Sequence, residues 1–289
     1  MGARLGPARI VGPLPSHTSY AHPTSARAKE THAMSRCCHS EVTAHAETAR
    51  PSIVSHEQWL LARKELLARE KEITHARDAL NASRRRLPMV RIEKSYRFEG
   101  PSGSVSLLDL FEDRTQLYVH HFMWIDERDA PCPSCSLVAD MLFNSVPFLA
   151  HLNSRDVTLV ATVRAPWAKL AELKARKGWT FPMYSSHGSD FNYDFHATLD
   201  ESKASTEYNY RTRDEMLRAG FDPALLRGDQ PVNTVFLRDG KDVFLTYSAS
   251  ARGLDQLFAP YNFLDLTPYG RQEPWEDSPP GWPQRNGMV

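Results

Sequence analysis

The sequence predicts an α/β fold in which helices flank a central mixed sheet, with a long amphipathic helix ahead of it. Two patterns support this prediction. Beyond residue 115, apolar runs of strand length alternate with segments of helical spacing, and Asp239-Gly240 between two apolar runs marks a hairpin. The chain can also bury a sizeable core, since 41% of its 289 residues are hydrophobic and 24% are charged.

The first 50 residues are expected to form a disordered tail, because they are rich in Ala, Ser, His, Arg and Pro and show no lasting apolar period. Residues 1–29 hold four basic side chains and no acidic one, which resembles an organelle transit peptide. Targeting by residues 1–30 is therefore a minority alternative to a cytoplasmic location. The adjacent Cys37 and Cys38 lie in this tail, and no role is assigned to them.

A single charged helix is predicted over residues 54–88. Ser55 and Gln58 fit a capping box at its start, and Pro88 stops it. An apolar side chain recurs every seven residues along it, at Trp59, Leu66, Ile73, Leu80 and Leu87. Such a stripe must be buried, either against the rest of the chain or against a second copy. A homodimer through residues 59–87 is thus one of two expectations for this helix.

Residues 89–271 are predicted to form one domain, with an irregular tail over residues 272–289. A short hairpin turns at residues 100–103. The strands expected after it are residues 117–124, 156–163, 181–184, 234–237 and 243–247, and the helices are residues 137–153, 166–177, 213–218 and 252–261. Pro147 is expected to kink the first of these helices. This order of elements is that of the thioredoxin fold.

The most specific motif is Cys132-Pro133-Ser134-Cys135, which stands where the 117–124 strand leads into a helix. Unpaired backbone N–H groups and the helix dipole at such a helix start favour the thiolate form of Cys132. Pro133 suits the first helical position because it has no N–H to leave unpaired. Cys135 falls nearly one turn deeper, so the pair suits reversible dithiol–disulfide chemistry.

A structural zinc site and an inert pair are lesser alternatives for the two cysteines. Zinc needs four ligands, and the sequence has no second Cys-x-x-Cys motif. His120 and His121 are adjacent on a strand and so point to opposite faces. We expect no metal and no cofactor. His121 is a candidate relay for the proton of the resolving thiol, although a histidine buried in the core is the commoner arrangement.

The charge balance argues against large charged partners. Lys and Arg together number 35, as do Asp and Glu, so the chain offers no general attraction to nucleic acid or to an anionic membrane. The sequence has no run of 18 or more apolar residues, so no transmembrane helix is expected.

Several motifs besides the dithiol carry a family resemblance. They are Gly178-Trp179-Thr180-Phe181-Pro182, the sequence GSDFNYDF at residues 188–195, Thr246-Tyr247-Ser248 and the sequence ARGLD at residues 251–255. With them the chain resembles the thioredoxin-like proteins known as domain of unknown function 899, often described as dithiol–disulfide oxidoreductases. The resemblance covers about residues 54–271. It implies a thioredoxin-like fold with a redox site at Cys132 and Cys135, and His121 also fits its pattern.

Other residues are candidates for supporting the site. Asp190 and Asp194 could line it with carboxylates, or the Gly, Ser, Asp and Asn residues around them could merely stabilise a turn. In thioredoxin-like folds a cis-proline before the last hairpin faces the dithiol, and Pro231 lies close to that place. Pro133 and Ser134 complete this set.

The sequence therefore predicts a thiol–disulfide oxidoreductase, with Cys132 as nucleophile and Cys135 as resolving thiol, acting on protein or small-molecule disulfides. One alternative is a thiol peroxidase of the alkyl-hydroperoxide-reductase type. That class has Thr or Ser three residues before the attacking cysteine, where this chain has Asp129, whose charge would oppose the thiolate. The other alternative is a non-catalytic thioredoxin-like interaction module that docks through residues 59–87.

Overall fold

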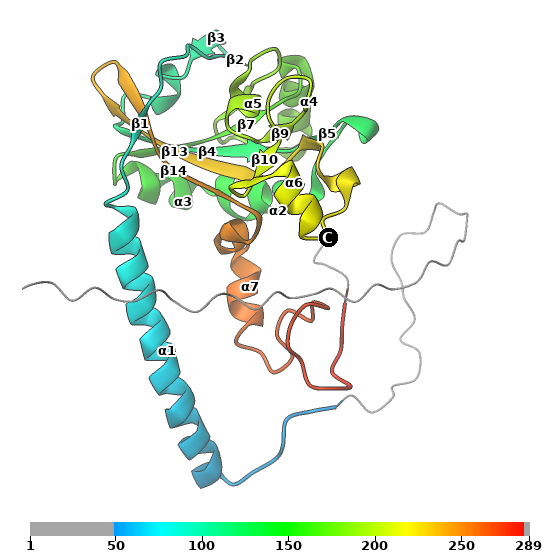
Figure 1. Cartoon of the computed structure of the whole chain (residues 1–289). Coiled ribbons are helices and arrows are strands. Elements are labelled where there is room, and N and C mark those ends of the chain that lie inside the picture. The colour runs from blue at the N-terminus through cyan, green and yellow to red at the C-terminus, as the bar shows by residue number, and fades with distance from the viewer. Residues whose placement is uncertain (1–48, 286–289) are drawn as a thin grey trace, which may run out of the picture. The chain divides into compact units, whose positions relative to one another are not determined.

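The computed structural model describes residues 49–285, and its central feature is a mixed sheet of eight strands (Figure 1). The strand order is β1-β14-β13-β4-β7-β8-β2-β3. These strands are β1 (Val90–Arg91), β2 (Arg97–Gly100), β3 (Gly103–Ser106), β4 (Gln116–Phe122), β7 (Val157–Val163), β8 (Met183–Ser185), β13 (Val232–Asp239) and β14 (Asp242–Ser250). The expectations for the N-terminal tail, including Cys37, Cys38 and the targeting alternative, fall almost wholly outside the described residues.

The centre of the sheet has the predicted thioredoxin-like arrangement. β4, β7 and β8 run parallel, whereas β13 pairs antiparallel with both β4 and β14. The hairpin between β13 and β14 turns through Gly240, whose φ of 58° is a conformation that glycine adopts without strain. Because parallel neighbours require a crossover helix, the dithiol segment must leave β4 and return over one face of the sheet. The predicted α/β fold class is confirmed.

Helices cover this sheet, and short ladders complete the chain. The helices are α1 (His56–Arg84), α2 (Pro133–Val138), α3 (Val146–Asn153), α4 (Trp167–Lys177), α5 (Phe191–Asp194), α6 (Arg213–Arg218) and α7 (Ala259–Leu264). The ladders pair β5 (Trp124–Ile125) with β6 (Ala130–Pro131), β9 (Thr198–Leu199) with β12 (Gly228–Asp229), and β10 (Glu207–Tyr208) with β11 (Arg211–Thr212).

Two apolar cores lie on the two faces of the sheet. One, which we call the dithiol core, contains both cysteines together with apolar residues of α2, α4 and β7. The other, the opposite core, holds residues of β2 and β13 with Phe191 of α5. Figure 1 shows α2 and α3 on one side of the sheet and α5 on the other. Strand alternation divides β4 between the cores, since Phe122 belongs to the first, and Leu117 and Val119 belong to the second.

The structure corrects three predicted boundaries. One helix kinked at Pro147 was expected, but the helical run from Pro133 ends at Phe143 and a separate helix, α3, begins after its N-cap Ser145. The two helices meet at an angle of 72°. Strand β4 ends at Phe122, and Trp124 belongs to β5. The expected closing helix is a 3-10 helix, Ala251–Leu257, followed by α7.

No single helix in the part of the chain that the structure describes is long and apolar enough to cross a bilayer. Only the bent pair Pro133–Phe143 and Val146–Asn153 passes that test of length and composition, and only when the two are taken together. Several residues of that pair, including Cys135 and Phe143, belong to the dithiol core.

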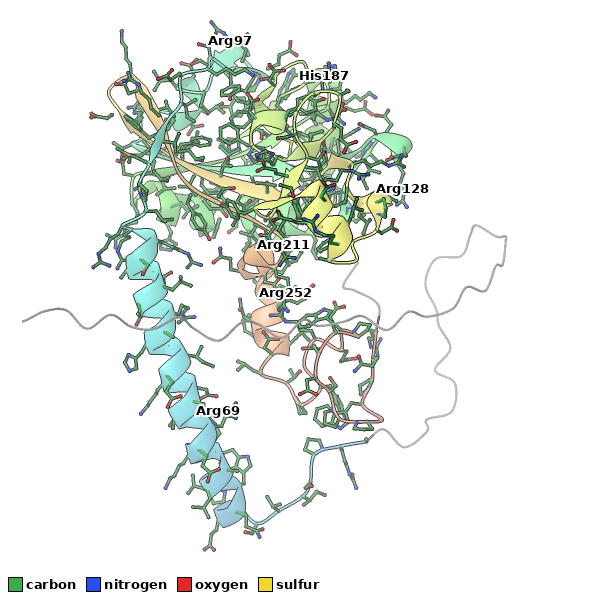
Figure 2. The ribbon with its side chains drawn as sticks, in the orientation of Figure 1. Arg69, Arg97, Arg128, His187, Arg211 and Arg252 are labelled. Atoms are coloured by element: carbon green, nitrogen blue, oxygen red, sulfur yellow. The ribbon has the colours of Figure 1, made fainter. Side chains whose placement is uncertain are left out.

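The long helix α1 forms as predicted, but none of its side chains is buried. Its capping box joins Ser55 and Gln58, and the helix ends at Arg84, four residues before Pro88. The stripe residues Trp59, Leu66 and Ile73 are 52%, 48% and 69% exposed. Figure 2 shows side chains, Arg69 among them, projecting all along this helix. Burial of the stripe against the chain's own domain is therefore not observed, and the homodimer through residues 59–87 stays a prediction.

Candidate functional site

The dithiol lies at the junction that the sequence predicts, where the chain turns from β4 into α2. The short β5–β6 ladder brings the chain back toward the end of β4, and the Cys132 N–H donates to the carbonyl of Met123 at 3.1 Å. Cys132 is the N-cap of α2, and Pro133 occupies its first turn. The Ser136 hydroxyl donates to the Cys132 carbonyl at 2.9 Å and closes that turn. Local sequence therefore holds the first sulfur at a helix start.

The two thiols are free and differ in their environment. Cys132 is 9% exposed and Cys135 is 3% exposed. A hydrogen bond from the Cys135 thiol, helped by the backbone N–H groups of Cys135 and Ser134, lowers the pKa of Cys132 to about 6. The same contact, together with burial, raises the pKa of Cys135 well above its usual range. Cys132 is thus the thiolate at neutral pH, and Cys135 keeps its proton.

This difference predicts the pH dependence of thiol alkylation. With a pKa of about 6, the thiolate fraction of Cys132 rises as pH rises through 6, so iodoacetamide should modify the reduced protein about tenfold faster at pH 7 than at pH 5. Mass spectrometry after limited reaction should find the label on Cys132 and not on Cys135. A Cys132→Ser variant is the control for background labelling. A rate midpoint near pH 9 would contradict the assignment.

A cavity of about 420 Å³ opens beside the two sulfurs. It lies between α2, the start of β13 and the 3-10 helix Ala251–Leu257, and is mostly apolar. Its lining is His120, Met123, Cys132, Ser134, Cys135, Val138, Tyr208, Gln230, Pro231, Ala251, Leu254, Asp255, Leu257 and Phe258. Its volume is that of a small-molecule site. Within residues 49–285, no three His, Cys, Asp or Glu side chains gather as metal ligands would.

The histidine at this cavity is His120, whereas His121 was the predicted candidate for a proton relay. Because side chains alternate along a strand, His121 faces the opposite core, where its ring stacks on Phe191 and its Nε2 lies 3.0 Å from the Thr234 hydroxyl. Burial lowers the pKa of His121 to about 3. The structure therefore does not bring His121 to the dithiol, and its surroundings are those of a core histidine.

The other predicted support residues divide into two groups. Pro231 and Ser134 line the cavity with both cysteines, and Pro133 starts α2. No cis peptide bond occurs in the described residues, so the peptide before Pro231 is trans.

Asp190 and Asp194 are held elsewhere. Lys94 pairs with both carboxylates, at 2.8 Å and 2.7 Å, and the Tyr96 hydroxyl donates to Asp194 at 2.7 Å. Neither carboxylate lines the dithiol cavity. Between them Phe191 packs in the opposite core. The structure thus supports the alternative in which these residues stabilise a turn.

Asp129, the residue that counted against peroxidase chemistry, has its own partners. Lys169 on α4 pairs with its carboxylate at 2.5 Å, and the Trp124 indole N–H donates to it at 3.1 Å. Both side chains of the ion pair are about half exposed. The lysine offsets the negative charge, which weakens the argument that Asp129 opposes a thiolate at Cys132.

A buried carboxylate beside the site, Asp229, is not among the residues predicted from the sequence. Its side chain is 2% exposed and accepts from the Trp124 backbone N–H at 3.0 Å, the Arg164 guanidinium at 2.9 Å and the Thr198 hydroxyl at 2.6 Å. Its negative charge also contributes to the raised pKa of Cys135, after larger contributions from Cys132 and burial. The one signal available from sequence is its place two residues before Pro231.

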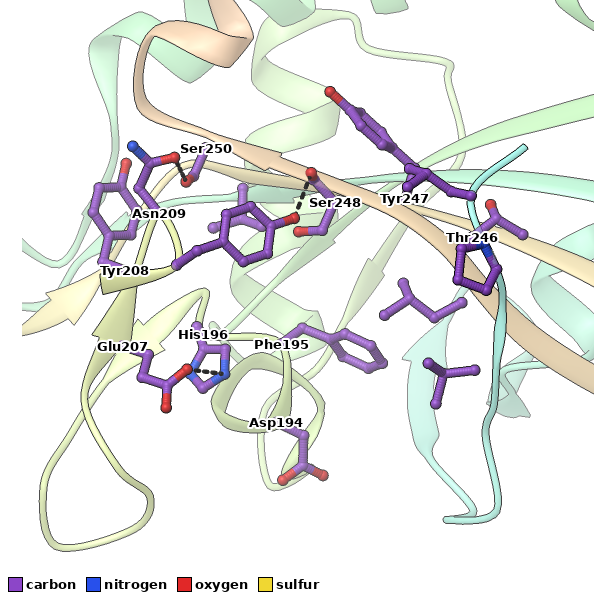
Figure 3. A pocket seen from close by; sticks show the side chains of 16 residues that line it. Asp194, Phe195, His196, Glu207, Tyr208, Asn209, Thr246, Tyr247, Ser248 and Ser250 are labelled. Carbon is purple, nitrogen blue, oxygen red and sulfur yellow. Dashed lines mark hydrogen bonds and ion pairs between the residues drawn. The ribbon is translucent and has the colours of Figure 1, made fainter. Parts of the chain in front are cut away.

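A second cavity of about 640 Å³ adjoins the first through Tyr208, which lines both (Figure 3). Tyr208 belongs to the β10–β11 hairpin, and its hydroxyl accepts from the Ala251 N–H at 3.0 Å. In the same hairpin the Tyr210 hydroxyl donates to the Ser248 carbonyl at 2.9 Å. Figure 3 shows Tyr208 and Asn209 beside Ser250 of β14. The hairpin therefore forms a wall between the two cavities, anchored on the end of β14.

Two comparisons bear on the sequence as a whole. A family model described as "Bacterial protein of unknown function (DUF899)" matches residues 48–286. No curated protein matches the chain.

Among solved structures, the chain is similar to peroxiredoxins. They include a mutant of PrxQ from Xylella fastidiosa (TM-score 0.36, 12% identity, 58% of this chain and 89% of that chain) and peroxidoxin BcpB from Mycobacterium tuberculosis (TM-score 0.38, 9% identity, 60% and 94%). Peroxiredoxin Q from Xanthomonas campestris is a third (TM-score 0.36, 12% identity, 57% and 86%). At these scores the likeness is too distant to indicate an activity, and the strand order itself establishes the fold.

Proposed function

The chain belongs to the DUF899 family of bacterial proteins, and we propose that its dithiol makes it a thiol–disulfide oxidoreductase. One observation carries the proposal. Cys132 and Cys135 lie one helical turn apart, and the pKa of the first is lowered to about 6 while that of the second is raised. A reactive thiolate beside a protonated partner is the arrangement that stepwise disulfide exchange requires.

The reaction follows from these two sulfurs. The Cys132 thiolate attacks one sulfur of a substrate disulfide, forms a mixed disulfide and releases the first substrate thiolate. Cys135 then gives up its proton and attacks the Cys132 sulfur, which releases the second thiolate, and the two released thiolates take up protons. The substrate gains two electrons and the dithiol becomes a disulfide. A thiol reductant returns the protein to its starting state, and the same steps in reverse would oxidise a substrate dithiol.

The lining of the cavity favours this function over a thiol peroxidase. No Lys or Arg is among the residues that line the dithiol cavity. Peroxide reduction develops negative charge on the leaving oxygen, and a cationic or other strong donor group would stabilise that charge. A thiolate leaving group with a diffuse charge needs less help of this kind. The cavity therefore suits disulfide exchange better than peroxide cleavage.

Two assays on the full chain separate these functions. With dithiothreitol as reductant, a catalytic amount of the protein is expected to accelerate the reduction of insulin disulfides or of a small disulfide. Hydrogen peroxide, supplied with the same reductant, should be consumed no faster than in the presence of the Cys132→Ser variant. Rapid peroxide turnover with no acceleration of disulfide reduction would show that the proposal is wrong.

A further inference from the structure

The apolar stripe of α1 is exposed along the whole helix. No side chain of α1 is buried, and the stripe residues beyond Ile73, which are Leu80 and Leu87, are each 50% exposed. Beside the stripe, Leu60 and Leu67 are exposed as well. At roughly 100 Å² for each half-exposed side chain of this size, these seven residues show on the order of 700 Å² of apolar surface. Monomeric proteins rarely leave so large an apolar patch uncovered.

The surface that matches this stripe is another copy of it. An apolar side chain that recurs every seven residues along a helix packs against a second helix with the same repeat. The rest of the chain supplies no such helix: residues 1–50 show no lasting apolar period, and the next longest helix among the described residues, α4, has 11 residues. The patch is also close in size to the roughly 800 Å² that each partner buries in a standard protein interface.

The charges and small residues of α1 suit a partner of the same kind. The helix holds six basic and five acidic side chains, so it offers little attraction to nucleic acid or an anionic membrane, and two copies carry no strong net repulsion. Arg63 pairs with Glu70 at 2.9 Å, so two charges at the edge of the stripe are already offset within the helix. Three residues after a stripe residue, the side chain is small at three of the four positions within the helix, Ala62, Ala76 and Ser83, which lets two helices approach closely.

We propose that two copies of this chain form a homodimer in which their α1 helices pack antiparallel along the stripe. The direction follows from Arg69, the one large residue at the fourth of these positions. In a parallel pair each residue lies level with its own copy, so two Arg69 side chains would meet between the helices and repel each other. In an antiparallel pair they lie apart, and the stripe, which is symmetric about Ile73, can still match all of its members. This inference goes beyond the proposed function and does not depend on it.

Sedimentation equilibrium of the full reduced chain tests the dimer. At about 10 µM protein the mass should be twice the 32.8 kDa of one chain. Ile73→Glu should raise the dissociation constant at least about a hundredfold, because it replaces an apolar contact at the centre of the stripe with two carboxylates that face each other. Leu61→Glu is the matched control. It places the same charge at an exposed leucine of the same helix, roughly 160° round the axis from Trp59, and should leave the dimer intact.

Disulfide trapping tests the direction of the pair. In a chain whose four native cysteines are replaced with serine, Ile73→Cys should cross-link readily on oxidation, because in the antiparallel pair position 73 meets its own copy. Arg69→Cys should not cross-link, since its two copies lie about 12 Å apart along the helix axis, which is too far for a disulfide. In a parallel pair both variants would cross-link equally.

The outcomes separate this inference from the proposed function. A full chain that stays monomeric at about 100 µM would overturn the inference, because another segment or another protein would then cover the stripe. A dimer that survives Ile73→Glu would place the interface elsewhere and overturn it as well. Cross-linking of Arg69→Cys as fast as Ile73→Cys would overturn the antiparallel direction. Ile73→Glu leaves the dithiol unchanged and should reduce disulfides as fast as the unmodified chain, so a failure of catalysis counts against the proposed function alone.

Discussion

Replacing Cys132 with serine should lower the rate of disulfide reduction by at least about a thousandfold. A hydroxyl at this position does not ionise near neutral pH, so the nucleophile is lost, while serine is itself a favoured N-cap residue. The assay is catalytic reduction of a disulfide by dithiothreitol, with the unmodified chain measured in parallel. Serine at this N-cap should also leave the fold intact, which circular dichroism checks.

Replacing Cys135 with serine is the matched control, because it removes only the second step. Cys132 can still attack a disulfide, so a mixed disulfide between Cys132 and the substrate should accumulate and appear in the intact mass of the protein. The pKa of Cys132 should rise in this variant, because the hydrogen bond from the Cys135 thiol is the largest cause of its lowering. If Cys132→Ser and Cys135→Ser both retained full catalytic activity, the dithiol would not be the active group.

Local sequence was sufficient to predict the dithiol and its setting. Cys132, Pro133 and Cys135 lie within one helical turn, so their geometry depends on helix capping and hardly at all on the rest of the chain. The capping box of α1 and the hairpin turn at Gly240 were predictable for the same reason. In each case the determining contacts join residues that are close in sequence.

Which histidine faces the site could not be predicted in this way. Alternation shows that His120 and His121 lie on opposite faces, but it does not show to which face the chain returns after β4. That depends on the β5–β6 ladder, which ties Cys132 to Met123, and on the crossover that brings α2 over the face of Phe122. The apolar stripe of α1 is similar in this respect. The seven-residue repeat shows which side chains form the stripe, but it does not show what covers them.

The pairing of Asp229 with Arg164 is also beyond sequence reasoning, because the two residues are 65 positions apart and no periodic pattern links them. In the structure Arg164 directly follows β7 and Asp229 belongs to β12, and both lie next to the strand end from which the dithiol segment departs. The carboxylate therefore ties three separate segments together behind the site. Such a group should matter for stability as much as for chemistry.

Replacing Asp229 with alanine should lower the free energy of unfolding by about 3–5 kcal/mol. The change takes from Arg164, 19% exposed in its side chain, its buried partner and leaves it only the exposed Asp126. It also removes the acceptor of the Trp124 backbone N–H and the Thr198 hydroxyl. Urea unfolding of the reduced chain, followed by tryptophan fluorescence, measures the loss.

Two controls separate the buried pair from a general effect of removing a charge. Asp129→Ala breaks the exposed pair with Lys169 and should change stability far less, because solvent already screens that pair. The double variant Asp229→Leu with Arg164→Met removes both buried charges and should be more stable than Asp229→Ala alone, since the one charge it leaves without a partner, Asp126, is exposed to solvent. A double variant less stable than Asp229→Ala would mean that Arg164 stabilises this end of the sheet through contacts other than its pairing with Asp229.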